Sequence, residues 1–150
     1  MSARTATLAT IRPDGRPRLV PICFVLAPFE HGGRWAVHTP LDEKPKSVDD
    51  PVQLARVRDI RARPEVALLV ERWSEDWSEL SWVRLEGRAE LIEPDPLDTN
   101  VQRVTRAVIK ALRDKYPQYK EHHLADRPMI MISGHGATSW RSQAPRRCAQ

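Results

Sequence analysis

The stretch WVRLEGRAELI, residues Trp82–Ile92, decides the fold of this 150-residue sequence. Apolar and charged residues alternate along most of it: Val83, Leu85, Ala89 and Leu91 are apolar, and Arg84, Glu86, Arg88 and Glu90 are charged. A period of two predicts a β-strand, because successive side chains of a strand point to opposite faces. One face of this strand must therefore meet a core and the other must meet water.

Further strands are expected on both sides of this stretch. Ala6–Ile11 runs into the turn signal Pro13-Asp14-Gly15 and the chain returns over Pro17–Leu26, which predicts a hairpin. The other expected strands are Arg34–Thr39 after Gly32-Gly33, Glu65–Trp73, and Pro128–Ser133 with a continuation over Ala137–Trp140. Gly134-His135-Gly136, between the last two segments, is expected to be a turn.

Two helices are expected between the strands. Asp50 and Pro51 read as an N-cap followed by a proline at the first helical position, and Pro64 ends this helix. Its apolar residues repeat at helical spacing: Leu54, Val57 and Ile60. The second helix begins after Asp98 or Thr99, and it carries an apolar stripe: Val101, Val104, Val108 and Leu112.

Short hairpins around two helices favour an antiparallel barrel over a βαβ fold. We therefore expect a mainly β (α+β) fold with six to seven antiparallel strands and two to three helices. The sequence contains no internal repeat, linker or low-complexity tract, so residues 1–150 are expected to form one domain with a frayed tail over residues 141–150.

The composition, 41% apolar and 29% charged, is typical of a soluble globular protein. The longest apolar runs are much shorter than the roughly 20 residues that cross a bilayer, and no signal peptide is recognised, so we expect a cytoplasmic protein without membrane contact. Two cysteines, Cys23 and Cys148, are no disulfide framework and are expected to be reduced.

The formal charge of +4 and the pI of about 9.4 favour anionic partners. No nucleic-acid-binding signature is present, so we expect no nucleic acid as a partner. The glycine-rich dinucleotide loop, the Walker loop, the nucleophile elbow and the zincin motif are absent as well. Neighbouring His122 and His123 cannot share one helix face, and no cysteine or carboxylate cluster completes a site, so no metal is expected.

Lys44 and Lys46 flank Pro45 just after an expected strand. Proline restricts the backbone, so both ammonium groups are held near one place. A phosphate suits such a pair, because it accepts charge-assisted hydrogen bonds from several donors. The alternative is an ordinary solvated loop.

Three of the five tryptophans, Trp73, Trp77 and Trp82, lie within ten positions around an acidic stretch. Large flat side chains can pack against an aromatic cofactor or across a subunit interface. The alternative is packing in the core of the chain itself.

Taken in order, four segments resemble the pyridoxamine 5′-phosphate oxidase-like split β-barrel superfamily: ATLATIRPDGRPRLVP (Ala6–Pro21), DEKPK (Asp42–Lys46), RVRDIRARPEVALLVERW (Arg56–Trp73) and EDWSELSWVRLEGRAEL (Glu75–Leu91). Within it they are most similar to the flavin/deazaflavin oxidoreductase branch, which includes coenzyme F420-dependent enzymes. The resemblance covers about Ala6 to Trp140 and implies a split β-barrel. Relatives usually carry a short helix before the first strand, whereas this sequence begins almost at that strand.

The resemblance also implies a homodimer with two cofactor sites at its interface. The ring system would lie along the second strand, at Arg18, Val20, Pro21 and Ile22, with Thr39 and Pro40 in the same pocket. Lys44, Pro45 and Lys46 would hold the cofactor phosphate, and Arg127 would face the cofactor tail. The other subunit would contribute Trp77, Ser78 and Trp82.

The expected function is that of an F420-dependent oxidoreductase, which transfers a hydride between the deazaflavin and an unsaturated or conjugated small molecule. The cofactor carries most of such chemistry, which agrees with the lack of a recognisable acid–base pair, so no catalytic residue is named. The alternatives are an FMN-dependent oxidase or reductase of the same fold, and a non-catalytic flavin- or F420-binding protein.

Overall fold

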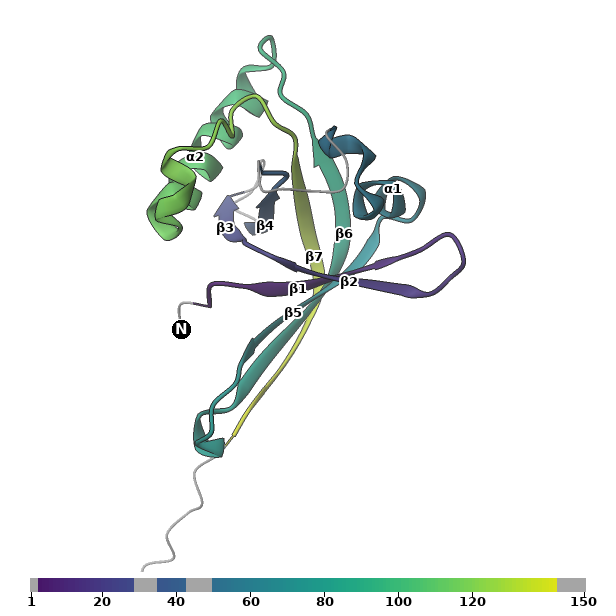
Figure 1. Ribbon diagram of the computed structural model, residues 1–150, viewed down its shortest axis with the longest axis vertical. Helices are drawn as coiled ribbons and strands as arrows, with labels where there is room; N and C mark the ends of the chain where they lie inside the picture. Colours follow the sequence, from purple (N-terminus) through teal and green to yellow (C-terminus); the bar gives the residue numbers. More distant parts are fainter. Residues whose placement is uncertain (1–2, 29–34, 43–49, 143–150) are drawn as a thin grey trace, which may run out of the picture.

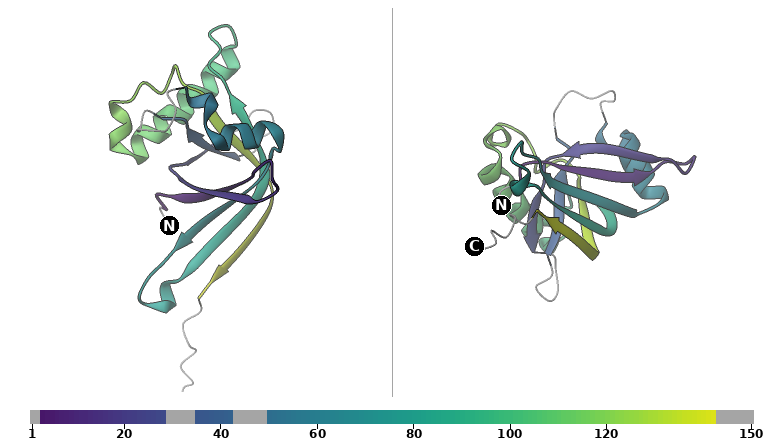
Figure 2. Two further views of the ribbon diagram at one scale, coloured as in Figure 1. Left: turned by 45° about the vertical axis from the view of Figure 1, so that its right-hand side comes forward. Right: turned by 90° about the horizontal axis from the view of Figure 1, so that it is seen from below.

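The computed structural model describes residues 3–28, 35–42 and 50–142. Within these residues, seven strands form one sheet in the order β2-β1-β5-β6-β7-β4-β3, with neighbouring strands antiparallel (Figure 1). The strands are β1 (Ala6–Ile11), β2 (Pro17–Ile22), β3 (Val25–Pro28), β4 (Trp35–Pro40), β5 (Glu65–Arg72), β6 (Ser81–Ile92) and β7 (Met129–Arg141). The sheet curls into a half-barrel, which confirms the expected mainly β fold (Figure 2).

The first hairpin forms as predicted. β1 and β2 pair along their full length, from Ala6 opposite Ile22 to Ile11 opposite Pro17. In the turn, the Gly15 N–H donates to the Arg12 carbonyl at 2.9 Å, and Gly15 adopts a φ of 82°. A side chain is strained at such an angle, so glycine is the residue that this turn requires.

The expected single strand Pro17–Leu26 is wrong, because the chain turns a corner at Cys23 and Phe24. β2 ends before the corner and β3 begins after it, at the opposite edge of the sheet. The Phe24 N–H donates to the Tyr116 hydroxyl at 2.9 Å, and the Lys115 ammonium donates to the Phe24 carbonyl at 2.8 Å. Side chains from far along the sequence therefore bind backbone groups that strand pairing would otherwise satisfy.

The expected turn at Gly134-His135-Gly136 is also wrong, because β7 continues through it. Glu86 lies opposite Gly136 and Gly87 opposite Gly134, so His135 is the extra residue of a β-bulge. A bulge bends its strand and increases the local twist. At the far end Arg141 pairs with Ser81, so the paired strand reaches into the tail that we expected to fray.

Two α-helices cover the sheet, as predicted: α1 (Ala55–Ala62) and α2 (Thr99–Lys115). Three short 3-10 helices accompany them: η1 (Pro51–Gln53), η2 (Trp77–Glu79) and η3 (Pro117–Lys120). The Asp98 side chain caps α2 by accepting from the N–H groups of Asn100 and Val101. Asp50 caps η1 in the same way by accepting from the Val52 N–H, so the expected first helix starts as a 3-10 turn.

The core divides into two clusters. The first lies inside the half-barrel and includes Leu8, Leu68 and Ile130, each at most 1% exposed. The second lies between α2 and β3 and includes Leu112 and Tyr119, both 0% exposed. In the described part of the chain, no helix has the length and apolar character that crossing a membrane demands.

One part of the sheet extends beyond both clusters. We call residues 71–84 and 137–142 the arm; they comprise the ends of β5 and β7, η2 and the start of β6, and they project away from α1 and α2 (Figure 1). Every arm residue is exposed or half-buried. The arm therefore has no core of its own.

Candidate functional site

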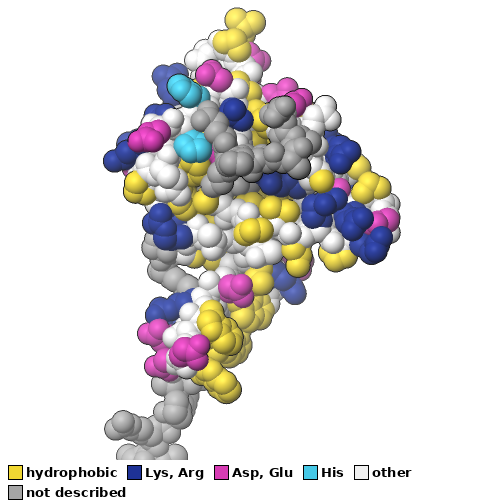
Figure 3. Space-filling view, viewed as in Figure 1, with side chains coloured by type: hydrophobic (Ala, Val, Ile, Leu, Met, Phe, Trp, Pro, Cys, Tyr) yellow, Lys and Arg dark blue, Asp and Glu magenta, His cyan; other side chains and the backbone are white. Residues whose placement is uncertain are grey.

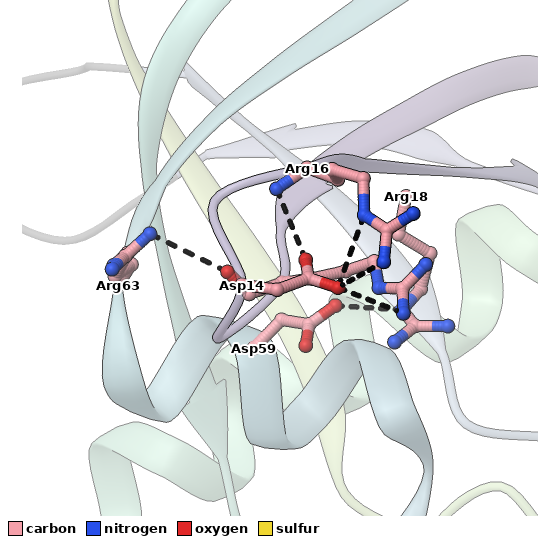
Figure 4. A network of polar contacts seen from close by, with 6 residues as sticks. Asp14, Arg16, Arg18, Asp59 and Arg63 are labelled. Carbon is pink, nitrogen blue, oxygen red and sulfur yellow. Dashed lines mark hydrogen bonds and ion pairs between the residues drawn. The ribbon is translucent and has the colours of Figure 1, made fainter.

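Arg18 of β2 is bound within the protein. Its Nε donates to Asp59 Oδ2 at 2.7 Å, and the Thr10 hydroxyl donates to the same oxygen at 2.8 Å. Asp59 lies on α1 and is 2% exposed. Figure 4 shows Arg18 and Asp59 beside the β1–β2 turn, where Arg63 and Arg16 add further polar contacts. Arg18 thus ties β2 to α1, a contact that the sequence did not suggest.

The other predicted residues of β2 have three different environments. Ile22 is 6% exposed in the first core cluster, and Val20 packs against that cluster. Pro21 is exposed. β2 is an edge strand that pairs with β1 alone among the described strands, so one backbone edge of β2 is open to a ligand.

Thr39, Pro40 and Arg127 come together at the end of β4. Thr39 is 3% exposed and Pro40 is buried, while Arg127 is half-buried just before β7. The two strand ends are joined there, because the Leu41 N–H donates to the Pro128 carbonyl at 3.2 Å. Lys44, Pro45 and Lys46, the predicted phosphate site, lie outside the described residues.

A buried polar cluster adjoins the end of β4. The Tyr119 hydroxyl donates to Asp42 Oδ2 at 2.7 Å, and Asp42 is 5% exposed. Burial, together with the neighbouring Asp42 carboxylate, raises the pKa of Tyr119, so this phenol stays protonated. Burial lowers the pKa of Arg56, whose Nε has no hydrogen-bond partner in the described residues. The sequence gives no sign of this cluster, because its residues are far apart in the chain.

Trp77, Ser78 and Trp82 lie on the arm. Trp77 and Ser78 begin η2, where Asp76 accepts from the Ser78 N–H at 2.9 Å. Trp77 is 72% exposed. Trp82 is half-buried and lies opposite Trp140 across β6 and β7. The three residues therefore share one arm, and the arm is separate from β2 and from the end of β4 (Figure 1).

A groove of about 820 Å³ runs beside the half-barrel. It is lined by the corner at Phe24, by β3, by the end of α2, and by Val70 and Val83 at the base of the arm. Lys115 lies in it, with Nζ 3.8 Å from the centroid of the Phe24 ring. Burial lowers the pKa of this ammonium group. The sequence contained no signal for the groove, because the corner that builds it was not predicted.

His38 lies on β4, which runs between β7 and β3 in the sheet. It is 1% exposed, and its register neighbours are Val25 on β3 and Met131 on β7. Burial lowers its pKa to about 4, and Nε2 has no hydrogen-bond partner in the described part of the chain. The imidazole is therefore neutral at pH 7, and apolar strands enclose it.

The described residues contain no group of histidine, cysteine and carboxylate side chains that could hold a metal ion. What the fold offers instead is an open strand edge at β2, a polar end of β4 and an apolar groove. These features suit the binding of a flat organic molecule better than acid–base catalysis, because ligand sites are mainly apolar with a few placed polar groups.

Several solved structures share this fold. The conserved hypothetical protein Rv2991 from Mycobacterium tuberculosis is 23% identical, with a TM-score of 0.65, and the match covers 93% of this chain and 78% of that chain. An F420 reductase is 23% identical, with a TM-score of 0.55 and coverages of 91% and 90%. An FMN-binding, pyridoxamine 5′-phosphate oxidase-related protein from Nostoc punctiforme is 16% identical, with a TM-score of 0.58 and coverages of 94% and 75%.

At these identities the likeness establishes the fold alone. No curated protein matches the sequence. A family model matches nearly the whole of the chain, over residues 1–140, and its description is pyridoxamine 5′-phosphate oxidase. This chain, with its curled antiparallel sheet, belongs to the pyridoxamine 5′-phosphate oxidase family.

Proposed function

We propose that this chain is an oxidoreductase that binds coenzyme F420 in sites shared by two copies. It transfers a hydride between the deazaflavin and an unsaturated or conjugated small molecule. The observation that carries the proposal is the separation of the expected site residues within one chain. β2 and the end of β4 belong to the half-barrel, whereas Trp77, Ser78 and Trp82 lie on the arm.

The arm supports a second copy as the partner. Trp73 and Trp77 are 74% and 72% exposed, and Trp140 is 47% exposed. Exposed apolar side chains gathered in one region mark interaction surfaces, and tryptophan is enriched at them. An arm that packs on a second half-barrel would bury these side chains and bring aromatic groups to that copy's cofactor site.

The half-barrel supports a flat ring as the ligand. β2 offers open backbone groups beside the exposed Pro21, and a ring edge can bind such groups by hydrogen bonds. Arg127 lies at the end of β4 and provides a cation for an anionic cofactor chain. Lys44 and Lys46 remain our prediction for the phosphate. Arg18, engaged by Asp59, serves to hold β2 in place for the ring.

When bound, the deazaflavin supplies the hydride chemistry, and the protein positions the ring and keeps water away from it. This division requires no acid–base pair. It agrees with the environment of His38, whose imidazole is neutral and enclosed by strands.

FMN is the alternative cofactor, because an open strand edge and a phosphate site serve both molecules. Heme proteins also have this fold, among them a heme storage protein from Vibrio cholerae. A binding protein without catalytic activity is a further alternative.

Parallel titration of the purified protein with F420, FMN and hemin tests the proposal, with fluorescence followed for the first two ligands and the Soret band for hemin. We expect F420 to bind most tightly, and we expect light scattering to give twice the chain mass of 17.2 kDa. If FMN or hemin binds more tightly than F420, that molecule takes the place of F420 as the assigned cofactor. If the protein stays monomeric with the cofactor bound, the site is not shared by two copies and this part of the proposal is wrong.

A further inference from the structure

The groove beside the half-barrel has one cation in its lining, Lys115, and a second cation, Arg4, lies next to the lining residue Ala3. Lys115 Nζ lies 5.3 Å from the centroid of the Tyr116 ring, and the Arg4 guanidinium carbon lies 5.2 Å from the same centroid. Arg4 follows Ala3, which lines the groove. The positive charge of Arg4 adds to burial in lowering the pKa of Lys115, which places the two cations within electrostatic reach of each other.

The Cys23 thiol lies within electrostatic reach of Lys115, but neither cation is paired with a carboxylate of the described residues. Among the described residues neither forms an ion pair; Lys115 donates only to the Phe24 carbonyl, at 2.8 Å. Asp114 lines the groove as well, but its carboxylate is 2.7 Å from Lys110 Nζ. Two like charges beside an apolar surface repel each other, and a bound anion would relieve that repulsion.

The rest of the groove is apolar. Val25, Leu26, Val70 and Val83 line it, and Leu26 and Val83 are 57% and 45% exposed. Its volume of about 820 Å³ is within the range of small-molecule sites. A ligand that matches both the apolar lining and the cations Lys115 and Arg4 has a flat apolar body with a negative group at one end.

We propose that this groove binds an amphipathic carboxylate, with the carboxylate on Lys115 and Arg4 and the apolar body against Leu26, Val70 and Val83. This inference rests on the proposed function in one respect: it assigns the small-molecule substrate of the oxidoreductase to the class of conjugated carboxylic acids. The binding itself needs no cofactor. Carboxylate and guanidinium groups pair well, since charge-assisted hydrogen bonds are short and strong.

Binding of cinnamate, a conjugated carboxylate, and of its neutral amide, cinnamamide, tests the proposal by calorimetry on the purified protein. We expect the wild type to bind cinnamate at least about tenfold more tightly than cinnamamide, which corresponds to 1.4 kcal/mol. Lys115→Met keeps the apolar stem and should remove the preference. Lys115→Arg should retain it, and so should Lys120→Met, which changes an exposed lysine of η3 outside the groove.

Arg4→Gln is a second variant that leaves the corner contact of Lys115 intact, and it should weaken cinnamate binding by severalfold. Equal affinity of the wild type for acid and amide, or no binding of either, would overturn the proposal. Loss of F420 affinity in Lys115→Met with cinnamate binding unchanged would overturn it too, and would assign the cations to the cofactor.

A further outcome concerns the arm as a rival occupant. If cinnamate binds to a Trp73→Ala/Trp77→Ala variant but not to the wild type, a partner's arm fills the groove of the wild type. The proposal would then be wrong. Cinnamate that binds in a Lys115-dependent way to a protein without F420 affinity would leave the carboxylate site standing while the proposed function fails.

Discussion

The half-barrel and the arm are built from the same strands, yet they differ in almost every physical respect. β5, β6 and β7 run through both. Within the half-barrel their side chains enter a core, as Leu68 and Ile132 do at 1% exposure each. In the arm, Trp140 of β7 is 47% exposed, and Trp73 and Trp77, which follow the end of β5, are 74% and 72% exposed. Figure 3 shows hydrophobic side chains gathered on the lower part of the molecule, beside acidic ones.

The difference teaches that strand pairing and burial serve separate purposes here. Backbone pairing continues to Ser81 and Arg141, so the arm has a defined shape without a core. A pair or triplet of strands gains little stability in water unless an apolar face is covered. The half-barrel is therefore the part that folds the chain, and the arm is the part that needs contact with another molecule.

The largest effect is expected where the half-barrel holds a buried charge. Asp59→Ala removes the acceptor shared by Thr10 and Arg18, and it should lower the free energy of unfolding by about 3 kcal/mol, since breaking a buried pair is costly and Arg18 is only partly exposed. Urea denaturation measures the change. Asp14→Ala is the matched control on the exposed turn, where a much smaller loss is expected because the carboxylate and its partners stay in water. Similar losses in both variants would contradict the role of the buried contact.

The next effect concerns the bend where the half-barrel passes into the arm. A Cβ added at Gly87 would lie 2.6 Å from the Ser133 carbonyl oxygen, and backbone atoms cannot move aside easily. Gly87→Ala should therefore cost about 2–3 kcal/mol of stability, at the upper end of overpacking effects. At Gly136, on the far side of the bulge, the nearest atom to an added Cβ is 3.8 Å away on the flexible Glu86 side chain. Gly136→Ala should be nearly neutral, and equal costs at both sites would refute the close approach.

The buried His38 should make the stability of the half-barrel depend on pH. Its pKa is lowered to about 4 by burial, whereas the unfolded chain has the ordinary value of about 6.5. Protons therefore favour the unfolded state in that window: stability is complete above pH 6.5 and declines as the pH falls toward 4. Between pH 7.5 and 5 the expected loss is about 2 kcal/mol. His38→Leu should flatten this part of the profile, and an unchanged slope would exclude His38 as its source.

The smallest effect on folding is expected in the arm. Trp77→Ala should leave the stability of the half-barrel within about 0.5 kcal/mol, because the side chain is 72% exposed. The same change should weaken dimerisation or cofactor affinity by roughly tenfold, since large aromatic side chains dominate interfaces. Sedimentation and F420 fluorescence measure the two affinities. If this variant unfolds, Trp77 belongs to a core, and the arm is then not the coreless part of the molecule described above.

Local patterns were enough for most of the fold. The alternation in Trp82–Ile92 identified β6, and the Asp98 cap located the start of α2 within one residue. The two errors arose where long-range contacts override local signals. Tyr116 and Lys115 bind the Phe24 backbone from more than 90 residues away, and the Gly134–Gly136 segment remains extended because Glu86 and Gly87 pair with it.

The candidate site was harder to predict for the same reason. The tryptophan cluster was visible as a local excess, and the structure places its members on one arm. Asp42 and Tyr119 are 77 residues apart, and the cations Arg4 and Lys115 meet only because α2 ends beside the N-terminal segment. A single sequence does not show which distant residues come into contact. The family resemblance points to β2 and the end of β4, where the cofactor site stays a prediction.

The corner at Phe24 has a consequence for how the chain folds. β2 and β3 are consecutive in sequence but stand at opposite ends of the strand order, so the five strands between them must assemble before the two edges reach their final places. Tyr116 and Lys115 can engage the corner only after α2 has docked. Because such non-local contacts form late, we expect folding in the slower range of milliseconds to seconds that is typical of β-rich topologies. The corner would then be the last element to reach its native structure, and the groove beside it would form only in that final step.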